Sequence, residues 1–420
     1  MIHRIGRRLR EQIHCFSGEL SVGLGKVLSR FVEEMIFGLS AGSSVRLTEI
    51  GRALEEECSL HATHKRLSRN LAAEELEEHV RKKVLELGAR RIGKDTLLVV
   101  DPSDLMKKYA EKMEYLAQIR DGSEKNIGRG YWLCQVVGCE VDSPEITPLA
   151  QVLWSQDAPD HVSENSEILK IVEQVREATE GNGILVFDRG GDRRRLLVPW
   201  TKDHSCRYMI RQRGDRNLLY KGRMLKGLDL AAFCKTPYAE TVIKEKAGRE
   251  EVFRLQFGFL PVRLPEHRDR PLWLVVVRGF GETPLMILTT EPMRRSRKCL
   301  WRAVKAYLTR WRIEETIRFI KQSYDLEDVR VLTYRRLRNI AALVLAASYF
   351  AAVWLGAKAK LEILAMHVMD AAKRIFGIPD FRYYALADGI SAVFKRVGKG
   401  PLCAETQLVG SIVQLPLFDP

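Results

Sequence analysis

Residues 307–321, YLTRWRIEETIRFIK, place one carboxylate among basic and aromatic side chains at helical spacing. No Pro or Gly interrupts this segment, and its isoleucines recur at the three-to-four spacing of a half-buried helix. At about 100° per residue, five polar side chains share one outward-facing stripe. They are Tyr307, Arg310, Glu314, Arg318 and Lys321. Such a stripe can be a solvated face with ion pairs, or a metal-binding carboxylate flanked by cations that bind phosphates.

Two more carboxylates follow short apolar runs far from this helix in the sequence. Residues 96–100 lead into Asp101 and residues 183–187 lead into Asp188, and both runs predict buried strands. An Asp at a strand end is ordinarily a turn or capping residue. If all three acids converge, they form a site for two Mg²⁺ or Mn²⁺ ions, which prefer oxygen ligands and catalyse phosphoryl transfer. The acids that could replace the two aspartates in this role are Asp104 and Asp192.

The elements around these acids are predicted in a definite order. Strands are expected at residues 96–100, 131–138, 146–154, 183–187 and 207–211, and helices at 163–179 and 192–200. When the helix that carries Glu314 is added at the end, the order of these strands and helices matches a ribonuclease-H-like core. In such a sheet the first and fourth strands can lie side by side. Asp101 and Asp188 would then meet at one edge, and Glu314 would complete the cluster.

We expect an α/β protein in which a ribonuclease-H-like catalytic core is interrupted by a β-rich insertion. Strand-like runs separated by Gly and Pro turns predict the insertion. The expected regions are a helical N-terminal DNA-binding domain (1–92), the first part of the core (93–211), the β-rich insertion subdomain (212–298), the catalytic helix with the end of the core (299–378), and a C-terminal tail region (379–420) after a largely helical stretch.

Residues 45–71 read as a helix, a short turn and a basic second helix. The basic side chains of that second helix include Lys65, Arg66 and Arg69. A helix-turn-helix would place them in a DNA major groove. An ordinary helical hairpin with a solvated basic side is the alternative.

Composition favours a nucleic-acid partner. The 420 residues carry 68 Lys and Arg against 54 Asp and Glu, for a formal charge of +14. A membrane surface is disfavoured because the basic residues are spread along the chain. The apolar run 340–357 is nearly long enough to span a bilayer, but its Ala-rich composition suits a helix inside a large soluble core.

Targeting and cysteine patterns favour a reduced, cytoplasmic location. The eight Cys show no CxxC spacing, so neither a zinc ribbon nor a redox motif is indicated. The basic N-terminal stretch lacks the apolar core of a secretory signal.

The spacing Tyr307-x2-Arg310-x3-Glu314-x6-Lys321 resembles the YREK signature of the bacterial DDE transposases of the IS-four insertion-sequence family. Asp101 in VVDPSDLMKKYA and Asp188 in VFDRGGD are similar to the first and second Asp motifs of that family. The resemblance implies that Asp101, Asp188 and Glu314 are catalytic and together hold Mg²⁺ or Mn²⁺, two ions per site.

The resemblance also implies contacts with double-stranded DNA. Tyr307, Arg310 and Lys321 would bind backbone phosphates near the cleaved bond, with Arg189 and Arg318 as further candidates. Trp273 and Trp301 are candidates for stacking on an extruded base. The family further implies a homodimer in the complex that joins two transposon ends, without a membrane, at the bacterial nucleoid in the cytoplasm.

The function that these features predict is a transposase. It would bind the inverted-repeat ends of its insertion sequence and move the element by metal-dependent cleavage and strand transfer. One alternative is a catalytically silent DNA-binding relict of such an enzyme. Another is a Mg²⁺-dependent nuclease, which would lack strand joining by a DNA 3′-OH.

Overall fold

The computed structural model describes residues 2–120, 122, 126–143, 145–246, 249–371, 382–398 and 400–401. For residues 244–246, 249–250, 312–322, 365–371 and 382–385 it describes the backbone alone.

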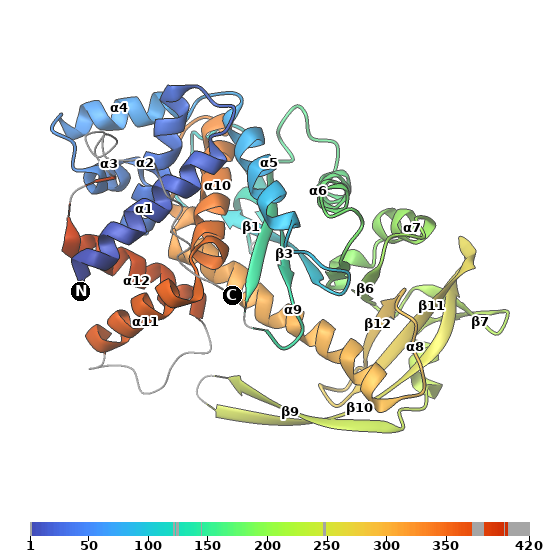
Figure 1. The fold of residues 1–420 in the computed structure, drawn as a ribbon. Helices are drawn as coiled ribbons and strands as arrows, with labels where there is room; N and C mark the ends of the chain where they lie inside the picture. Colours follow the sequence, from blue (N-terminus) through green and yellow to red (C-terminus); the bar gives the residue numbers. More distant parts are fainter. Residues whose placement is uncertain are drawn as a thin grey trace.

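Helices form the N-terminal region, as predicted (Figure 1). They are α1 (Ile2–Leu20), α2 (Lys26–Gly42), α3 (Leu47–Leu54), α4 (Leu60–Asn70) and α5 (Leu76–Ala89). The predicted helix, turn and basic helix are confirmed as α3 and α4, and both pack against α2. Ser59 begins α4 because its hydroxyl accepts a hydrogen bond from the backbone N–H of Ala62 at 3.3 Å.

The described strands form one large mixed sheet. Its first part contains β1 (Leu97–Met106), β2 (Ala117–Arg120), β3 (Ile127–Cys139), β4 (Ile146–Trp154), β5 (Ile184–Phe187) and β6 (Tyr208–Arg211). The order across this part is β4-β3-β1-β5-β6, and β2 pairs with the start of β3. The pairs β1/β3 and β3/β4 are antiparallel, whereas β1/β5 and β5/β6 are parallel. The predicted neighbourhood of the first and fourth expected strands, β1 and β5, is therefore confirmed.

The insertion continues this sheet. It contains β7 (Asn217–Tyr220), β8 (Arg223–Lys226), α8 (Gly227–Phe233), β9 (Tyr238–Lys246), β10 (Arg249–Leu264), β11 (His267–Arg278) and β12 (Leu285–Thr289). Strand β12 pairs with β6, and the order then runs β12-β11-β10-β7-β8, with β9 on β10 (Figure 1). Between residues 97 and 289, the strands and α-helices that the sequence did not predict are β2, β8 and α8, and all three are short.

Helices cover both faces of the sheet. One face carries α6 (Glu164–Ala178) and α7 (Arg194–Lys202), and the other carries α9 (Arg297–Ser323), α10 (Tyr334–Tyr349) and the N-terminal helices. The remaining described helical segments are η1 (Arg189–Gly191), η2 (Leu326–Asp328), η3 (Phe350–Trp354), α11 (Ala357–Ala371) and α12 (Arg382–Val397). In Figure 1, α9 extends from the insertion toward the N-terminal helices.

The apolar run predicted to be a core helix belongs to α10 and η3. The stretch Tyr334–Trp354 has 21 residues, and its most apolar window of 18 residues has a mean hydropathy of 1.5, which suffices by length and composition to cross a membrane. However, 83% of its most apolar window is buried inside the protein, as in the central helix of a packed core.

Candidate active site

Asp101 lies in β1, and Asp188 directly follows β5, the parallel neighbour of β1. The register pairs Leu97 with Ile184 and Val99 with Val186, so the same offset, continued by two residues, places Asp101 opposite Asp188. Neighbouring strands lie roughly 4.8 Å apart. Because side chains alternate along a strand, both aspartates belong to the face of Val99 and Val186, which packs in the same core as α9.

Asp188 stands where β5 gives way to η1. Its Oδ1 atom accepts a hydrogen bond from the backbone N–H of Gly190 at 2.6 Å, and its side chain is half-buried. The turn requires glycine, because a Cβ atom at Gly190 would lie 2.8 Å from this Oδ1 atom, and one at Gly191 would lie 2.8 Å from Phe187. Gly190 and Gly191 therefore permit the tight turn that leads from β5 into η1.

Asp101 lies inside a strand, where the sequence predicted a strand end. Strand β1 continues to Met106 because its ladder with β3 runs from the pair of Leu97 and Cys139 to the pair of Met106 and Gly130. Asp101 is half-buried and stands opposite Gln135 of β3. A turn or capping role for Asp101 is therefore wrong, since residues beyond it remain in the ladder.

The two rival aspartates have other surroundings. Asp104 is an odd number of residues from Asp101, so it belongs to the opposite face of β1, and its Oδ1 atom accepts from the N–H of Gly122 at 3.3 Å. Asp192 is 6% exposed, pairs with Arg216 and accepts from the N–H of Arg213 at 2.8 Å. Burial raises the pKa of Asp192 above its ordinary value, although the charge of Arg216 opposes the shift. The geometry favours Asp101 and Asp188.

The helix that carries Glu314 packs against both strands, because α9 contacts β1 and β5. The side chains of Glu314, Arg318 and Lys321 lie outside the described residues, so their roles stay predictions. Among the described side chains, no three His, Cys, Asp or Glu residues lie close enough together to hold a metal ion.

The outward-facing stripe predicted for α9 is wrong at its N-terminal end. Tyr307 is 0% exposed and Arg310 is 4% exposed. The guanidinium of Arg310 lies 5.0 Å from the centre of the Tyr307 ring, and Trp311 meets that ring edge-on. The reason is that α9 runs between the sheet and other helices, so this part of the stripe faces the protein interior.

The basic residues of α4 differ in their surroundings. Arg66 pairs with Glu34 of α2 and with Glu56 in the turn before α4. Burial lowers the pKa of Arg66, but the two acids outweigh burial and raise it. Arg66 therefore fastens α4 to its neighbours, whereas Lys65 and Arg69 are exposed.

His61 shares the outer face of α4 with these two cations. It is exposed, precedes Lys65 by four residues and precedes Arg69 by eight. Residues at this spacing lie on one side of a helix. His61 was not among the predicted DNA contacts, and its helical spacing from Lys65 and Arg69 was the signal that could have placed it on the basic face.

The other predicted DNA contacts are scattered. Arg189 is exposed beside Asp188. Trp301 is half-buried and stacks on Phe257, with ring centres 5.6 Å apart and planes inclined by 24°. Trp273 is half-buried in the middle of β11, between Pro261 and Thr289 of the adjacent strands.

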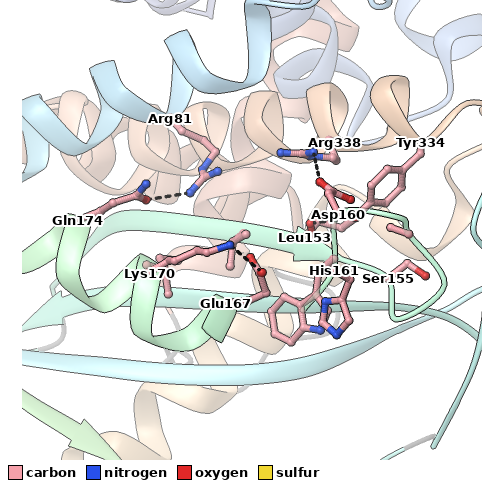
Figure 2. A pocket seen from close by; sticks show the side chains of 14 residues that line it. Arg81, Leu153, Ser155, Asp160, His161, Glu167, Lys170, Gln174, Tyr334 and Arg338 are labelled. Atoms are coloured by element: carbon pink, nitrogen blue, oxygen red, sulfur yellow. Dashed lines mark hydrogen bonds and ion pairs between the residues drawn. The ribbon is translucent and has the colours of Figure 1, made fainter. Parts of the chain in front are cut away.

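A polar cavity of about 210 Å³ lies at the other edge of the core, between β4, α5, α6 and α10 (Figure 2). Its charged side chains are engaged with one another. Lys170 donates to Glu167 at 3.2 Å, Arg81 donates to Gln174 at 3.2 Å, and Arg338 lies 3.9 Å from Asp160. Strand β3 and strand β1 separate this cavity from Asp188, so it is not part of the candidate active site.

Lys107 joins the strand of Asp101 to the segment that follows α9. It is 5% exposed, and its ammonium donates to the backbone carbonyls of Glu327 and Val329, the latter at 2.7 Å. Burial lowers the pKa of Lys107 to about 8, although Asp328, Glu327 and Asp325 oppose the shift. The ammonium thus fixes the end of β1 to η2, the short helical segment that follows α9.

Because the pKa of Lys107 is lowered in the folded chain, the stability of the fold should depend on pH. At a pH between about 8 and 10.5, the ordinary pKa of lysine, the unfolded chain binds more protons at Lys107 than the folded chain does. The free energy of unfolding should therefore rise with pH in this range. The slope should approach about 1 kcal/mol per pH unit. Urea unfolding of the wild type and of Lys107→Met, measured from pH 7.5 to 10, should show this slope only in the wild type. Equal slopes in both proteins would contradict the role of Lys107.

Comparison with known proteins identifies the family. Residues 128–350 match the family model of the transposase DDE domain, and the matched range includes Asp188 and Glu314 but begins after Asp101. A cryo-EM structure of a piggyBac transposase synaptic complex with hairpin DNA is similar over 97% of this chain and 80% of that chain, with 9% sequence identity and a TM-score of 0.42. No curated protein matches the chain. Because the family match covers more than half of the 420 residues, the chain belongs to the transposase DDE-domain family, whose members are DNA-cleaving and DNA-transferring enzymes.

Proposed function

We propose that this chain is a DDE transposase of the IS-four type that binds the inverted-repeat ends of its own insertion sequence, cleaves them and joins them to target DNA. The observation that carries the proposal is the β1/β5 register, which, when continued two residues beyond Val99 and Val186, aligns Asp101 with Asp188 on the face that packs with α9. Two independent turn residues have no reason to align in this way. Glu314, on α9, is the third proposed catalytic acid.

The sheet supports a ribonuclease-H-like core. Its order β4-β3-β1-β5-β6 has antiparallel pairs on one side of β1 and parallel pairs on the other. That arrangement puts the carboxyl end of β5 beside the middle of β1, where Asp101 lies. The insertion enters after β6 and returns through β12 to α9.

The proposed cofactor is Mg²⁺ or Mn²⁺, with two ions held by Asp101, Asp188 and Glu314. The donor set fits, because carboxylate oxygens are the ligands that hard cations prefer. When bound, such ions polarise the scissile phosphate and activate the attacking hydroxyl. The chain itself orients Asp188 through the N–H of Gly190 and holds Asp101 inside a continuous ladder.

DNA binding is proposed for the exposed cations. Lys65 and Arg69 would enter the major groove with α4, and Arg189 would contact a phosphate beside Asp188. The further proposed contacts near the cleaved bond are Tyr307, Arg310, Arg318, Lys321, Trp273 and Trp301. Tyr307 and Arg310 are buried in the free chain, so their contact with DNA requires α9 to be uncovered on binding. A homodimer would join two ends, in the bacterial cytoplasm.

Incubation with the inverted repeats that flank the gene tests the proposed function. The wild-type chain with Mg²⁺ should cut these end duplexes at a fixed bond and join the 3′-OH to a target plasmid. Cutting without joining would indicate a nuclease, and binding without cutting would indicate a DNA-binding relict. Either result would overturn the proposal.

The salt dependence of end binding should identify the DNA-reading face. Lys65→Ala and Arg69→Ala should each reduce the slope of log K against log salt by about one unit, because one phosphate contact is lost. Fluorescence anisotropy on end duplexes measures this slope. The control is Lys170→Ala, an exposed lysine of α6 paired with Glu167, which should leave the slope unchanged. Unchanged slopes in the α4 variants would place DNA elsewhere.

A further inference from the structure

A row of buried amide side chains crosses the molecule from the strand of Asp101 to the helix-turn-helix. It consists of Gln135 on β3, Gln151 on β4 and Asn339 on α10, which are 3%, 2% and 1% exposed. Glutamine and asparagine are mostly exposed in proteins, so three buried amides on β3, β4 and α10 need an explanation.

The row begins beside the candidate active site. Gln135 stands directly opposite Asp101 in the β1/β3 ladder, and residues opposite one another share a face of the sheet. Its Nε2 atom donates to Oε1 of Gln151 at 2.6 Å. Nε2 of Gln151 then donates to the backbone carbonyl of Ala341 in α10 at 2.9 Å.

The row ends on the helix-turn-helix. Two residues before Ala341, Asn339 donates through Nδ2 to the backbone carbonyls of Leu71 and Ala73, both at 2.8 Å. These carbonyls terminate α4 and the turn that follows it. A neighbouring donor from α10, Nε of Arg336, reaches the carbonyl of Ser68 at 2.9 Å. Helix α10 thus closes the C-terminal end of α4.

Hydrogen bonds of this kind fix position. Apolar side chains of the same size would bury as much surface, but they would allow α10 to slide over β4. A hydrogen bond of about 2.9 Å from an amide side chain forms at only one placement of α10 relative to β4. The row therefore specifies how the helix-turn-helix sits relative to the sheet that carries Asp101.

We infer that Gln135, Gln151 and Asn339 are positioning residues that fix the distance between the DNA sequence read by α4 and the phosphodiester bond cleaved at Asp101 and Asp188. The inference rests on the proposed function. According to this inference, two things determine which bond is cleaved: the bases that α4 recognises and the rigid connection through α10.

The test maps the cleaved bond. End-labelled duplexes of the flanking inverted repeats are cut by the wild type, Gln151→Met and Asn339→Leu, and the products are resolved on a sequencing gel. Both variants should bind the ends within about threefold of the wild type, because α4 keeps its exposed face. Their cuts should spread over neighbouring bonds, with less than half remaining at the wild-type position.

A control variant removes size effects. Leu153→Met changes a buried residue of similar volume on the same strand and in the same core, with no change in side-chain hydrogen bonds. It should cut at the wild-type bond. If Gln151→Met and Asn339→Leu also cut only there, the inference is overturned.

Two further measurements cover other outcomes. If Gln151→Met does not fold, the double variant Gln135→Met/Gln151→Met removes both members of the bonded pair and takes its place. If the wild type cuts nothing, the proposed function fails, and hydrogen exchange in Asn339→Leu then decides the positioning role alone. Faster exchange of the α4 amides would support the connection, and unchanged exchange would overturn it.

Discussion

Asp101→Asn and Asp188→Asn should each lower the rate of end cleavage roughly a thousandfold or more, while end binding stays nearly unchanged. Asn keeps the shape of Asp and its hydrogen-bonding oxygen, so the Gly190 N–H retains its partner. The negative charge that would hold a divalent cation is lost. Cleavage of labelled end duplexes at saturating Mg²⁺, beside anisotropy with the same duplexes, separates the two effects.

Asp104→Asn is the matched control for Asp101→Asn. It makes the same chemical change in the same strand, three residues away and on the opposite face of the sheet. Asn can still accept from the N–H of Gly122, so cleavage should remain within a few fold of the wild type. A larger loss in Asp104→Asn than in Asp101→Asn would reverse the assignment of the first catalytic aspartate.

Arg216→Ala should destabilise the fold by about 3–5 kcal/mol, the effect expected when one partner of a buried ion pair is removed. The variant leaves the Asp192 carboxylate buried, with the N–H of Arg213 as its remaining described hydrogen-bond donor. The loss should shrink at acid pH. Burial already raises the pKa of Asp192, and removal of Arg216 raises it further, so protonation relieves the buried charge as pH falls.

Urea unfolding of a double-mutant cycle measures this coupling. Asp192→Asn and Arg216→Ala/Asp192→Asn complete the cycle, and the double variant should be more stable than Arg216→Ala because no charge is left buried. Additive losses at pH 7 would contradict a structural role for the pair. Asp192→Asn should also retain cleavage, in contrast with Asp188→Asn.

Much of the core could be predicted because its strands are short, apolar and locally encoded. Strand β4 has the predicted bounds, and β5 and β6 differ by one residue at their start. The alignment of Asp101 with Asp188 followed from the expected neighbourhood of the first and fourth strands. The extension of β1 to Met106 could not be predicted from local pattern, because it depends on pairing with Gly130 and its neighbours in β3.

Side-chain surroundings were harder to predict than elements. Helical spacing correctly grouped Tyr307 with Arg310 on one side of α9. The spacing does not show which side of the helix is covered by other elements, and both residues are buried. Arg66 looked equivalent to Lys65 and Arg69, yet Glu34, more than thirty residues earlier, engages it. Gln135 and Gln151 carry no motif, and only the strand register shows that they are opposite one another.

The ladder between β6 and β12 has a mechanical consequence. Because the sheet ladder crosses from β6 into the insertion at Ile210 and Leu288, the insertion is not joined to the rest of the sheet by a flexible hinge at that border. Any tilt of the long β9/β10 hairpin toward a bound duplex has to be absorbed as twist of the whole sheet. A load applied at the hairpin tip is thereby transmitted to the strands that carry the two aspartates.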